Sequence, residues 1–260
     1  MIRSNYFNAS GIIFLSDKNL IFSVSTFQMS LCIIQIKRSS FPMHAKVLLV
    51  DIQSKLLLHH ARNIIGFLPG RLDTCIVLTA HYDHLGQMGK NTWFPGANDN
   101  ATGTAMLLNY IREYVTNPEK QKYTLVFMLF SGEEAGLLGS TYYVDHPLFP
   151  LGKIKILINL DMEGAGSGGI TVFNGTNNPI QFHRLNYLNQ ALALHLKLVA
   201  KGGNKNSDQA PFHEKQVPAL YILTEGKEVP YHSVKDVYET LPFTAYEKLY
   251  KLIDAYIKAF

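Results

Sequence analysis

The sequence predicts an α/β domain with a mostly parallel sheet and helices on both of its faces. From residue 44 onwards, short apolar runs rich in β-branched and aromatic residues are flanked by turn residues, which is typical of strands buried on both faces. Stretches with helical periodicity lie between these runs, and strands that alternate with helices build such a sheet. A length of 260 residues with 47% hydrophobic residues is enough for a large core.

The strands of this domain are expected at six apolar runs, and its helices at four stretches. The runs are AKVLLV, NIIGFL, CIVLTA, YTLVFMLF, IKILINL and ALYILT. The helical stretches are residues 100–116, 134–145, 179–196 and 243–259. Asn178 suits an N-cap and Pro179 suits a first helical position, which supports the start of the third helix. The last helix places its apolar residues on one stripe, which is typical of core packing.

Residues 1–43 are expected to form a separate, β-rich piece, and residues 44–260 the main domain. The runs GIIFL, NLIFSVSTF and LCIIQIK predict short strands between residues 10 and 40. The piece opens without an obvious first strand, as if an upstream part were missing. The apolar region 20–36 is interrupted by serine, threonine and glutamine, so we expect no membrane span there. The first 18 residues lack the basic start and continuous apolar stretch of a signal peptide.

Charge and cysteine content exclude several classes of protein. The 24 Lys and Arg residues against 20 Asp and Glu residues give a net charge of only +4, without a long basic run, so nucleic acid is not an expected partner. Cys32 and Cys75 are too few for a disulfide scaffold or a thiolate zinc site. Cys75 lies in an apolar run and is expected to be a buried small hydrophobe.

Candidate metal ligands stand where predicted strands end. His81 ends one apolar run, Glu133 and Glu134 follow another, and Asp161 ends a third. In open α/β sheets the ligand site lies beyond the carboxyl ends of the strands. The positions of these residues therefore agree with the topology that the apolar runs predict.

His81 is followed two residues later by Asp83, and in an extended chain such side chains lie on the same face. A metal-bound histidine usually donates its other ring N–H to a carboxylate, which orients the ring. The spacing supplies such a partner locally, although a histidine and an aspartate two residues apart are often incidental. His84 is out of phase with His81, and we do not expect it to be a ligand.

Asp99 lies in the segment PGANDNATG, between a strand-like and a helical stretch. An ordinary N-cap loop would explain the segment equally well, because Asp and Asn favour such positions. A helix N-terminus also stabilises a carboxylate, so a cap and a ligand cannot be told apart locally. The other candidate ligands favour the second reading, because one carboxylate can present an oxygen to each of two cations held roughly 3.5–4 Å apart.

Glu133 and Glu134 are adjacent carboxylates that repel each other unless a positive charge lies nearby. The start of a surface helix could solvate both. Beside a cation site the two can have different roles, with Glu134 as a ligand and Glu133 as the base that takes a proton from a metal-bound water. Asp161 would be costly to bury without compensation. His232 lies in a loop, four residues before Asp236, which could orient that loop.

Five further histidines lack a carboxylate at a useful spacing and are expected to be structural or exposed. They are His59, His60, His146, His195 and His213.

Five ordered motifs resemble those of the M28 family of co-catalytic dizinc aminopeptidases, from about residue 44 to the C-terminus. They are AHYDHLG, PGANDNATGT, FSGEEAGLLGS, NLDMEG and YHSVKDVYE. The resemblance implies a three-layer α/β/α sandwich around a mixed, mostly parallel sheet of about eight strands. It also implies two Zn²⁺ ions per chain, which suits mixed imidazole and carboxylate ligands.

The resemblance assigns a role to each candidate residue. One zinc belongs to His81 and Asp161, and the other to Glu134 and His232. Asp99 bridges the two ions. Glu133 is the general base, and Asp83 is the partner that orients His81. The resemblance also implies a cis peptide bond between Asp99 and Asn100.

Other parts of the chain resemble the family less completely. Residues 10–40 resemble the tail of a protease-associated insert whose beginning is absent. In the segment SDQAPF, relatives commonly have histidine at the position of Gln209. That loop borders the site in relatives, so the resemblance leaves the substrate preference open. Family members are commonly exported, so the resemblance implies a secreted or periplasmic protein.

The predicted function is hydrolysis of the N-terminal peptide bond of peptides, with a pair of metal ions and a glutamate base. A single-zinc reaction like that of glutaminyl cyclases is an alternative enzyme function. A non-catalytic scaffold of the same fold is an alternative of another class. An intact set of ligands for two ions argues against both alternatives. Peptides are the expected partners, and the sequence does not determine the oligomeric state.

Overall fold

The structure, a computed structural model, describes residues 8–28, 31–53, 55–117, 121–227 and 229–260. The chain forms two compact units, Met1–His60 and Ala61–Phe260. The two units are described separately below.

In the N-terminal unit, β1 (Gly11–Ser16) pairs in parallel with β2 (Cys32–Lys37), as the apolar runs predict. The segment 19–27 is not a strand, although it was expected to be one. The run 45–50 is likewise neither helix nor strand, and the side chain of Leu49 is 97% exposed. Composition alone suggested strands at these two places, but a strand also needs a neighbour to accept its backbone hydrogen bonds.

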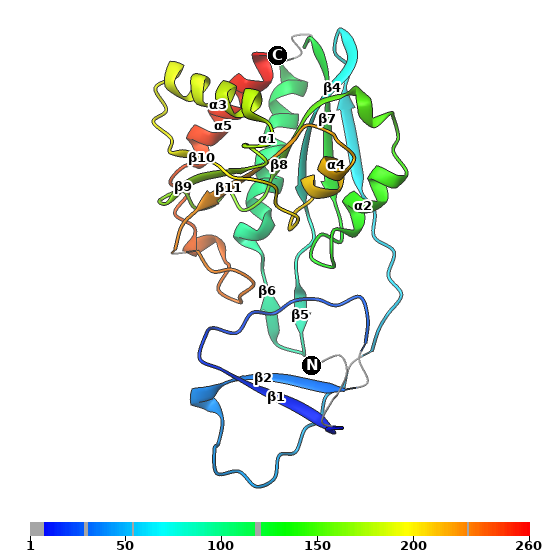
Figure 1. The fold of residues 1–260 in the computed structure, drawn as a ribbon, viewed down its shortest axis with the longest axis vertical. Helices are drawn as coiled ribbons and strands as arrows, with labels where there is room; N and C mark the ends of the chain where they lie inside the picture. Colours follow the sequence, from blue (N-terminus) through cyan, green and yellow to red (C-terminus); the bar gives the residue numbers. More distant parts are fainter. Residues whose placement is uncertain (1–7, 29–30, 54, 118–120, 228) are drawn as a thin grey trace. The chain divides into compact units, whose positions relative to one another are not determined.

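The second unit is built on a mixed sheet, in which the structure describes seven strands (Figure 1). Their order is β10-β9-β11-β8-β4-β7-β3. The bounds are β3 Ile64–Leu68, β4 Leu72–His81, β7 Tyr123–Phe130, β8 Ile154–Leu160, β9 Gly169–Phe173, β10 Leu198–Ala200 and β11 Ala219–Glu225. Only the β3–β7 and β11–β9 pairs are antiparallel, so the sheet is mostly parallel. A separate hairpin joins β5 (Gly86–Met88) to β6 (Thr92–Phe94).

Helices cover both faces of this sheet, which confirms the predicted α/β sandwich (Figure 1). One face carries α1 (Thr102–Thr116), α3 (Pro179–Ala191) and α5 (Tyr246–Lys258). The other face carries α2 (Leu138–Asp145) and α4 (Gln209–Glu214). Short helical turns lie at Ala97–Ala101, Leu151–Lys153 and Tyr238–Thr240.

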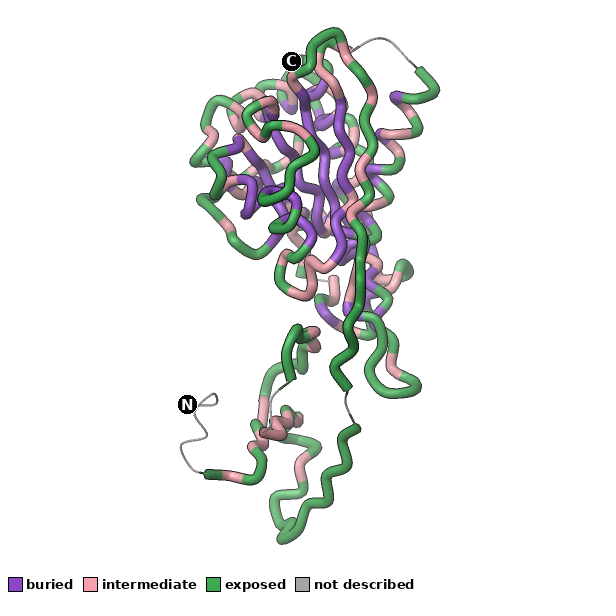
Figure 2. The backbone as a smooth tube through the Cα atoms, turned by 90° about the vertical axis from the view of Figure 1, so that its right-hand side faces the viewer, coloured by how far each residue is buried: buried purple, intermediate pink, exposed green. Residues whose placement is uncertain are grey.

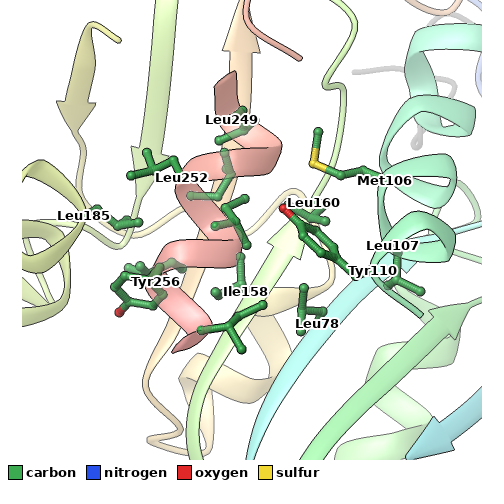
Figure 3. Packing of buried hydrophobic residues seen from close by; sticks show 14 of the residues in the cluster. Leu78, Met106, Leu107, Tyr110, Ile158, Leu160, Leu185, Leu249, Leu252 and Tyr256 are labelled. Atoms are coloured by element: carbon green, nitrogen blue, oxygen red, sulfur yellow. The ribbon is translucent and has the colours of Figure 1, made fainter. Parts of the chain in front are cut away.

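The alternation of side chains along β4 divides the core between the two faces. Ile76 and Leu78 join the cluster under α1, α3 and α5, whereas Cys75 and Val77 join the cluster under α2 and α4. Figure 2 shows that the central strands are buried along most of their length. Figure 3 shows side chains of α5 and α1 meeting over the strands of the first cluster. Cys75 is buried, as its apolar surroundings predict.

Several elements differ from the predicted ones. β9, β10 and α4 were not expected, because each is too short to give a clear periodicity. The third helix ends at Ala191 and not at 196, since Ala193 and His195 have positive φ angles that a right-handed helix cannot include. The second helix begins only at Leu138, after Gly136 and Leu137, which also have positive φ angles.

Parallel neighbours bring the predicted ligands to one edge of the sheet. β4, β7 and β8 lie side by side and run in the same direction. His81 at the end of β4 is paired with Phe130 at the end of β7, and β8 ends at Leu160. The residues that follow β7 and β8, including Glu133 and Asp161, therefore leave the sheet beside His81.

The described helices include none that is both long enough and apolar enough to cross a lipid bilayer.

Burial on α1 allows a direct test of the core. Leu107 is fully buried in the first cluster, whereas its neighbour Leu108 is 49% exposed. We expect Leu107→Ala to lower the free energy of unfolding by about 2–5 kcal/mol, because the surrounding side chains cannot close the cavity. Leu108→Ala should change it by about 0.5 kcal/mol or less. Urea unfolding followed by circular dichroism measures both, and equal losses would place Leu107 outside the core.

Candidate metal centre

The predicted ligands converge on Asp99, whose two carboxylate oxygens face different histidines. Oδ1 of Asp99 lies 3.2 Å from Nε2 of His81, and Oδ2 lies 3.3 Å from Nε2 of His232. The Asp99 side chain is only 6% exposed. A carboxylate in this position divides the site into two halves.

Each half is completed by one more carboxylate. In the first half, Oδ1 of Asp161 lies 3.4 Å from Nε2 of His81. In the second half, Oε2 of Glu134 lies 3.1 Å from Nε2 of His232. The structure therefore brings together all five predicted ligands, although they come from positions as far apart as 81 and 232 in the sequence.

The loop that carries Asp99 is held by side chains on both sides of it. The Asp99–Asn100 peptide bond is cis, as the family resemblance implies. Asn100 donates from Nδ2 to the carbonyl of Leu160 (2.9 Å), and its Oδ1 accepts from the backbone N–H of Gly103. These bonds tie the start of α1 to the end of β8. Both interpretations of this segment therefore apply, each to a different residue. Asp99 faces the site as a candidate ligand, and Asn100 holds the start of the helix as a cap would.

Asp236 provides the second support of this loop. Its Oδ1 accepts from the backbone N–H of Asn98 (2.8 Å) and its Oδ2 from that of Asp99 (3.1 Å). The side chain of Asp236 is fully buried. From the sequence, Asp236 could orient the loop of His232. Its carboxylate instead holds the backbone of the Asp99 loop.

His81 and the glutamate pair share Asp83 as a common support. Nδ1 of His81 is 3.0 Å from the backbone carbonyl oxygen of Asp83 and 3.8 Å from its Oδ1. The carboxylate of Asp83 accepts from the backbone N–H groups of Glu133 (3.2 Å) and Glu134 (3.3 Å). Asp83 therefore orients the imidazole through its main chain and both glutamates through its side chain.

Asp161 is held by two residues that the sequence analysis did not assign to the site. Ser207 donates from Oγ to Oδ2 of Asp161 (2.6 Å). The fully buried Glu163 accepts from the backbone N–H of Asp161 through Oε1 (3.1 Å). Glu163 follows Asp161 by two residues, as Asp83 follows His81. This repeated spacing could have indicated that Glu163 supports Asp161.

His84, which we do not expect to be a ligand, contacts one of the predicted ligands. Its Nδ1 lies 2.7 Å from Oε1 of Glu134, and its side chain is 9% exposed. Gly96 has φ +69°, and a Cβ there would lie 2.5 Å from Cγ of His84, so the ring packs against a position that needs glycine. Alternation could not predict this contact, because β4 ends at His81 and residues beyond a strand end no longer point to alternate sides.

The loop of His232 is also shaped for the site. His232 has φ +48°, a left-handed conformation that is uncommon for residues other than glycine. The ring of Tyr231 stacks on the ring of His232, with centroids 3.8 Å apart and an interplanar angle of 20°. This contact covers one face of the imidazole with a ring that is itself 49% exposed.

The buried ionisable groups of the site have strongly shifted pKa values, because of burial and of one another's charge. Burial lowers the pKa of His232, but its hydrogen bonds to Asp99 and Glu134 outweigh this effect and raise the pKa to about 10. Burial raises the pKa of Asp99, yet hydrogen bonds from His232 and His81 hold it well below its usual range. For Glu133, burial dominates and raises the pKa to about 10, although His81 lowers it.

These groups fit divalent cations. The ion pairs of the site's carboxylates, within the described part of the chain, are all made by histidines. Nδ1 of His84 faces Oε1 of Glu134, whereas Nε2 of His84 is buried without a hydrogen-bond partner among the described residues. Ligand atoms of His81, Glu133 and Asp161 lie within 4.8 Å of one another, and so do those of His84, Asp99 and Glu134. A bound cation would replace protons on His81 and His232 and offset the negative charge of the carboxylates.

A cavity of about 220 Å³ opens beside the carboxylates of Asp99, Glu133 and Asp161. Besides the proposed metal centre, its lining has five apolar or aromatic side chains and two asparagines. These wall residues are Met162, Phe173, Tyr221, Leu223, Tyr231, Asn204 and Asn206. A molecule in this cavity would contact Glu133 and the ligands of both halves.

Comparisons with known proteins agree with this geometry. The family model described as Peptidase family M28 matches residues 63–257. Aminopeptidase YwaD of Bacillus subtilis (strain 168) is 30% identical over 175 residues, which cover 63% of this chain and 36% of that protein. A probable leucine aminopeptidase of Trichophyton verrucosum (strain HKI 0517) is 30% identical over 201 residues, covering 70% of this chain and 51% of that protein.

Solved structures are similar to the second unit as well. The structure of BSAP, a zinc aminopeptidase from Bacillus subtilis, has a TM-score of 0.63 at 27% identity, over 75% of this chain and 49% of that chain. Porphyromonas gingivalis glutaminyl cyclase has a TM-score of 0.65 at 20% identity, over 76% of this chain and 77% of that chain, which shows a shared fold. The chain spans about a third to a half of the length of the aminopeptidases named here.

The clamp on the Asp99 loop predicts a stability effect. We expect Asp236→Ala to destabilise the protein by about 1–3 kcal/mol for each buried N–H group left without a partner. Asp73→Ala removes an aspartate whose side chain is 77% exposed and paired with Lys153, and should have no measurable effect. Urea unfolding in the presence of a chelator compares the variants without a metal contribution. An Asp236 variant as stable as the Asp73 variant would contradict the clamp.

Proposed function

The chain belongs to peptidase family M28, and from this premise we propose that it is a metal-dependent aminopeptidase that removes the first residue of peptides. The observation that carries the proposal is the position of Asp99, with one carboxylate oxygen directed to each of two histidines. That arrangement suits a pair of cations, which is the centre used by many hydrolases.

The proposed centre holds two zinc ions. His81 and Asp161 would bind one ion, Glu134 and His232 the other, and Asp99 both. Two Zn²⁺ ions bring +4 and three carboxylates bring −3, so the site keeps a positive charge that can hold an anionic oxygen. His84 would stay outside the ligand set and orient Glu134, whose Oε1 lies 2.7 Å from its ring.

Glu133 has the role of general base in this proposal. Zinc ions bound here would polarise the scissile carbonyl and lower the pKa of the attacking water towards 7. Glu133 lines the cavity beside both halves of the site, and Asp83 holds its backbone N–H. Cations bound beside it would lower the pKa that burial raises, so that the ionised carboxylate could take the proton of the attacking water and then give it to the leaving amine.

The cavity favours cleavage next to a chain end. A volume of about 220 Å³ accommodates one large side chain and not several residues. Met162, Phe173 and Leu223 give it an apolar wall, so leucine or phenylalanine should be accepted more readily than a charged first residue. The names of the curated relatives, which include leucine aminopeptidases, agree with this proposal.

The alternative of a glutaminyl-cyclase-like reaction with a single zinc is less well supported. The second half of the site, with His232 and Glu134, has its own complete set of donors. Assaying pyroglutamate formation beside the release of p-nitroaniline from leucine-p-nitroanilide separates the two reactions.

For the N-terminal unit we propose that residues 1–43 belong to a protease-associated insert. Support comes from its β-structure, with the parallel pair β1–β2, and from the family match, which begins only at residue 63. Secretion or export to the periplasm stays a prediction from the family resemblance.

The role of Glu133 can be tested by one isosteric change. Glu133→Gln should retain the zinc content of the wild type and lose about 10²–10⁴-fold in kcat for leucine-p-nitroanilide, because the amide cannot accept the proton. Glu247→Gln changes an exposed glutamate on α5 and should keep full activity. Activity near that of the wild type in Glu133→Gln would remove Glu133 from the role of base.

The bridging position of Asp99 makes a separate prediction. Asp99→Asn replaces one of its two oxygens by an N–H₂ group, so the affinity for both zinc ions should fall by roughly tenfold or more. Asp145→Asn, at a half-exposed ion pair with Lys215, is the matched control. Equilibrium dialysis with metal analysis measures both affinities, and the loss of only one ion would contradict the bridge.

A further inference from the structure

Gln209 is a fully buried amide that is linked to the wall of the cavity. It is the first residue of α4, and its side chain has no exposed surface. Its Nε2 donates to the backbone carbonyl of Asn204 at 2.8 Å. Its Oε1 is 3.5 Å from Nδ2 of Asn159. The amide therefore lies between the interior of the protein and a loop.

On the interior side, Gln209 rests on the central sheet. Asn159 is a buried residue of β8, and its Oδ1 accepts from Oγ1 of Thr79 on β4 at 2.7 Å. Nδ2 of Asn159 also donates to Oγ of Ser207 at 2.8 Å. These strands lie in the middle of the sheet, so Gln209 has a rigid support.

On the side of the loop, the hydrogen bond from Gln209 to the carbonyl of Asn204 reaches the wall of the cavity. Asn204 and Asn206 both line the cavity. Oδ1 of Asn204 accepts from the backbone N–H of Asn206 at 2.7 Å, so a displacement of Asn204 moves Asn206 as well. The position of this wall thus depends on where the carbonyl of Asn204 is held.

The loop has little else to hold it between Gly202 and Ser207. Gly202 accepts a hydrogen bond from the backbone of Asn174 at 3.0 Å. Lys205 pairs with Glu214 at 2.8 Å, but their side chains are 82% and 58% exposed, and such pairs contribute little. Among the described contacts of the segment, the bond from the fully buried Gln209 is partly shielded from solvent, whereas the bond between Asn206 and Asn204 is exposed. Shielded hydrogen bonds are costly to lose.

The same network divides into two branches at Asn159. Ser207 continues from Asn159 to Asp161, the proposed zinc ligand. Gln209 continues to Asn204 and does not reach the ligands in any described contact. A change at Gln209 therefore alters the wall of the cavity while Ser207 still supports Asp161.

We propose that Gln209 is a positioning residue that sets the asparagine wall of the cavity and thereby determines which first residue the enzyme accepts. The proposal rests on the aminopeptidase function proposed above. A change at Gln209 should therefore alter KM and leave kcat nearly unchanged, because Glu133 and the proposed ligands stay in place when the wall moves.

The test is Gln209→Met, which keeps the length of the side chain and removes its N–H donor. With leucine-, phenylalanine- and lysine-p-nitroanilide, we expect KM to rise about five- to tenfold for the best substrate. The differences in KM among the three substrates should become smaller. The value of kcat should stay within about twofold, and the zinc content should not change. Gln190→Met, an exposed glutamine on α3, is the control and should leave all values unchanged.

Two further variants keep the test informative. Gln209→His retains one ring N–H donor and should restore much of the lost affinity. Asn204→Ala lies in the surface loop and removes the bond to Asn206 without a change in the core, so it should raise KM in the same direction. An unchanged KM in Gln209→Met or in Asn204→Ala would overturn the proposal. Loss of zinc together with kcat in Gln209→Met would overturn it too, since Gln209 would then support the metal centre.

Hydrogen–deuterium exchange separates this inference from the proposed function. The amide of Asn206 should exchange faster in Gln209→Met than in the wild type, and at the wild-type rate in Gln190→Met. Unchanged exchange would overturn the positioning role whether or not the protein is active. If the wild type releases no product from any substrate, the proposed function fails, and the exchange rate of Asn206 still decides the role of Gln209.

Discussion

The mutual repulsion of buried carboxylates is the constraint on which the rest of this site depends. Asp99, Glu133, Glu134 and Asp161 approach one another at one edge of the sheet, and burial alone would drive them to take up protons. His81 and His232, which come from two separate segments, provide positive charge that offsets this repulsion. The site therefore has the electrostatic character of a binding centre for cations before any cation is bound.

Acidic residues that are not proposed ligands do much of the positioning. Asp83 and Asp236 each accept hydrogen bonds from two consecutive backbone N–H groups, one pair at the glutamates and one pair at Asp99. Glu163 accepts from the backbone of Asp161 in a similar way. Carboxylates hold backbone N–H groups strongly because the acceptor is charged. The ligands are thus fixed through their main chains, which leaves their side-chain oxygens directed to the site.

The sequence allowed the prediction of those features that depend on long, regular patterns. The runs at 75–80, 123–130 and 154–160 are long and apolar, and all three became strands of the sheet with proposed ligands at or after their ends. The run at 45–50 has a similar composition but remains exposed, because tertiary pairing decides whether such a run becomes a strand. His84 could not be found by alternation, since its direction depends on the turn after β4. The place of Gln209 depends on contacts between α4, β8 and a loop, which no local pattern encodes.

Asp236 supports Asp99 across 137 residues of sequence, and His232 lies in the same late segment. Residues 232–236 therefore supply both the support of Asp99 and the second histidine. Contacts between residues so far apart in sequence carry a loop-closure cost, so the site can form only when the whole second unit has folded around it.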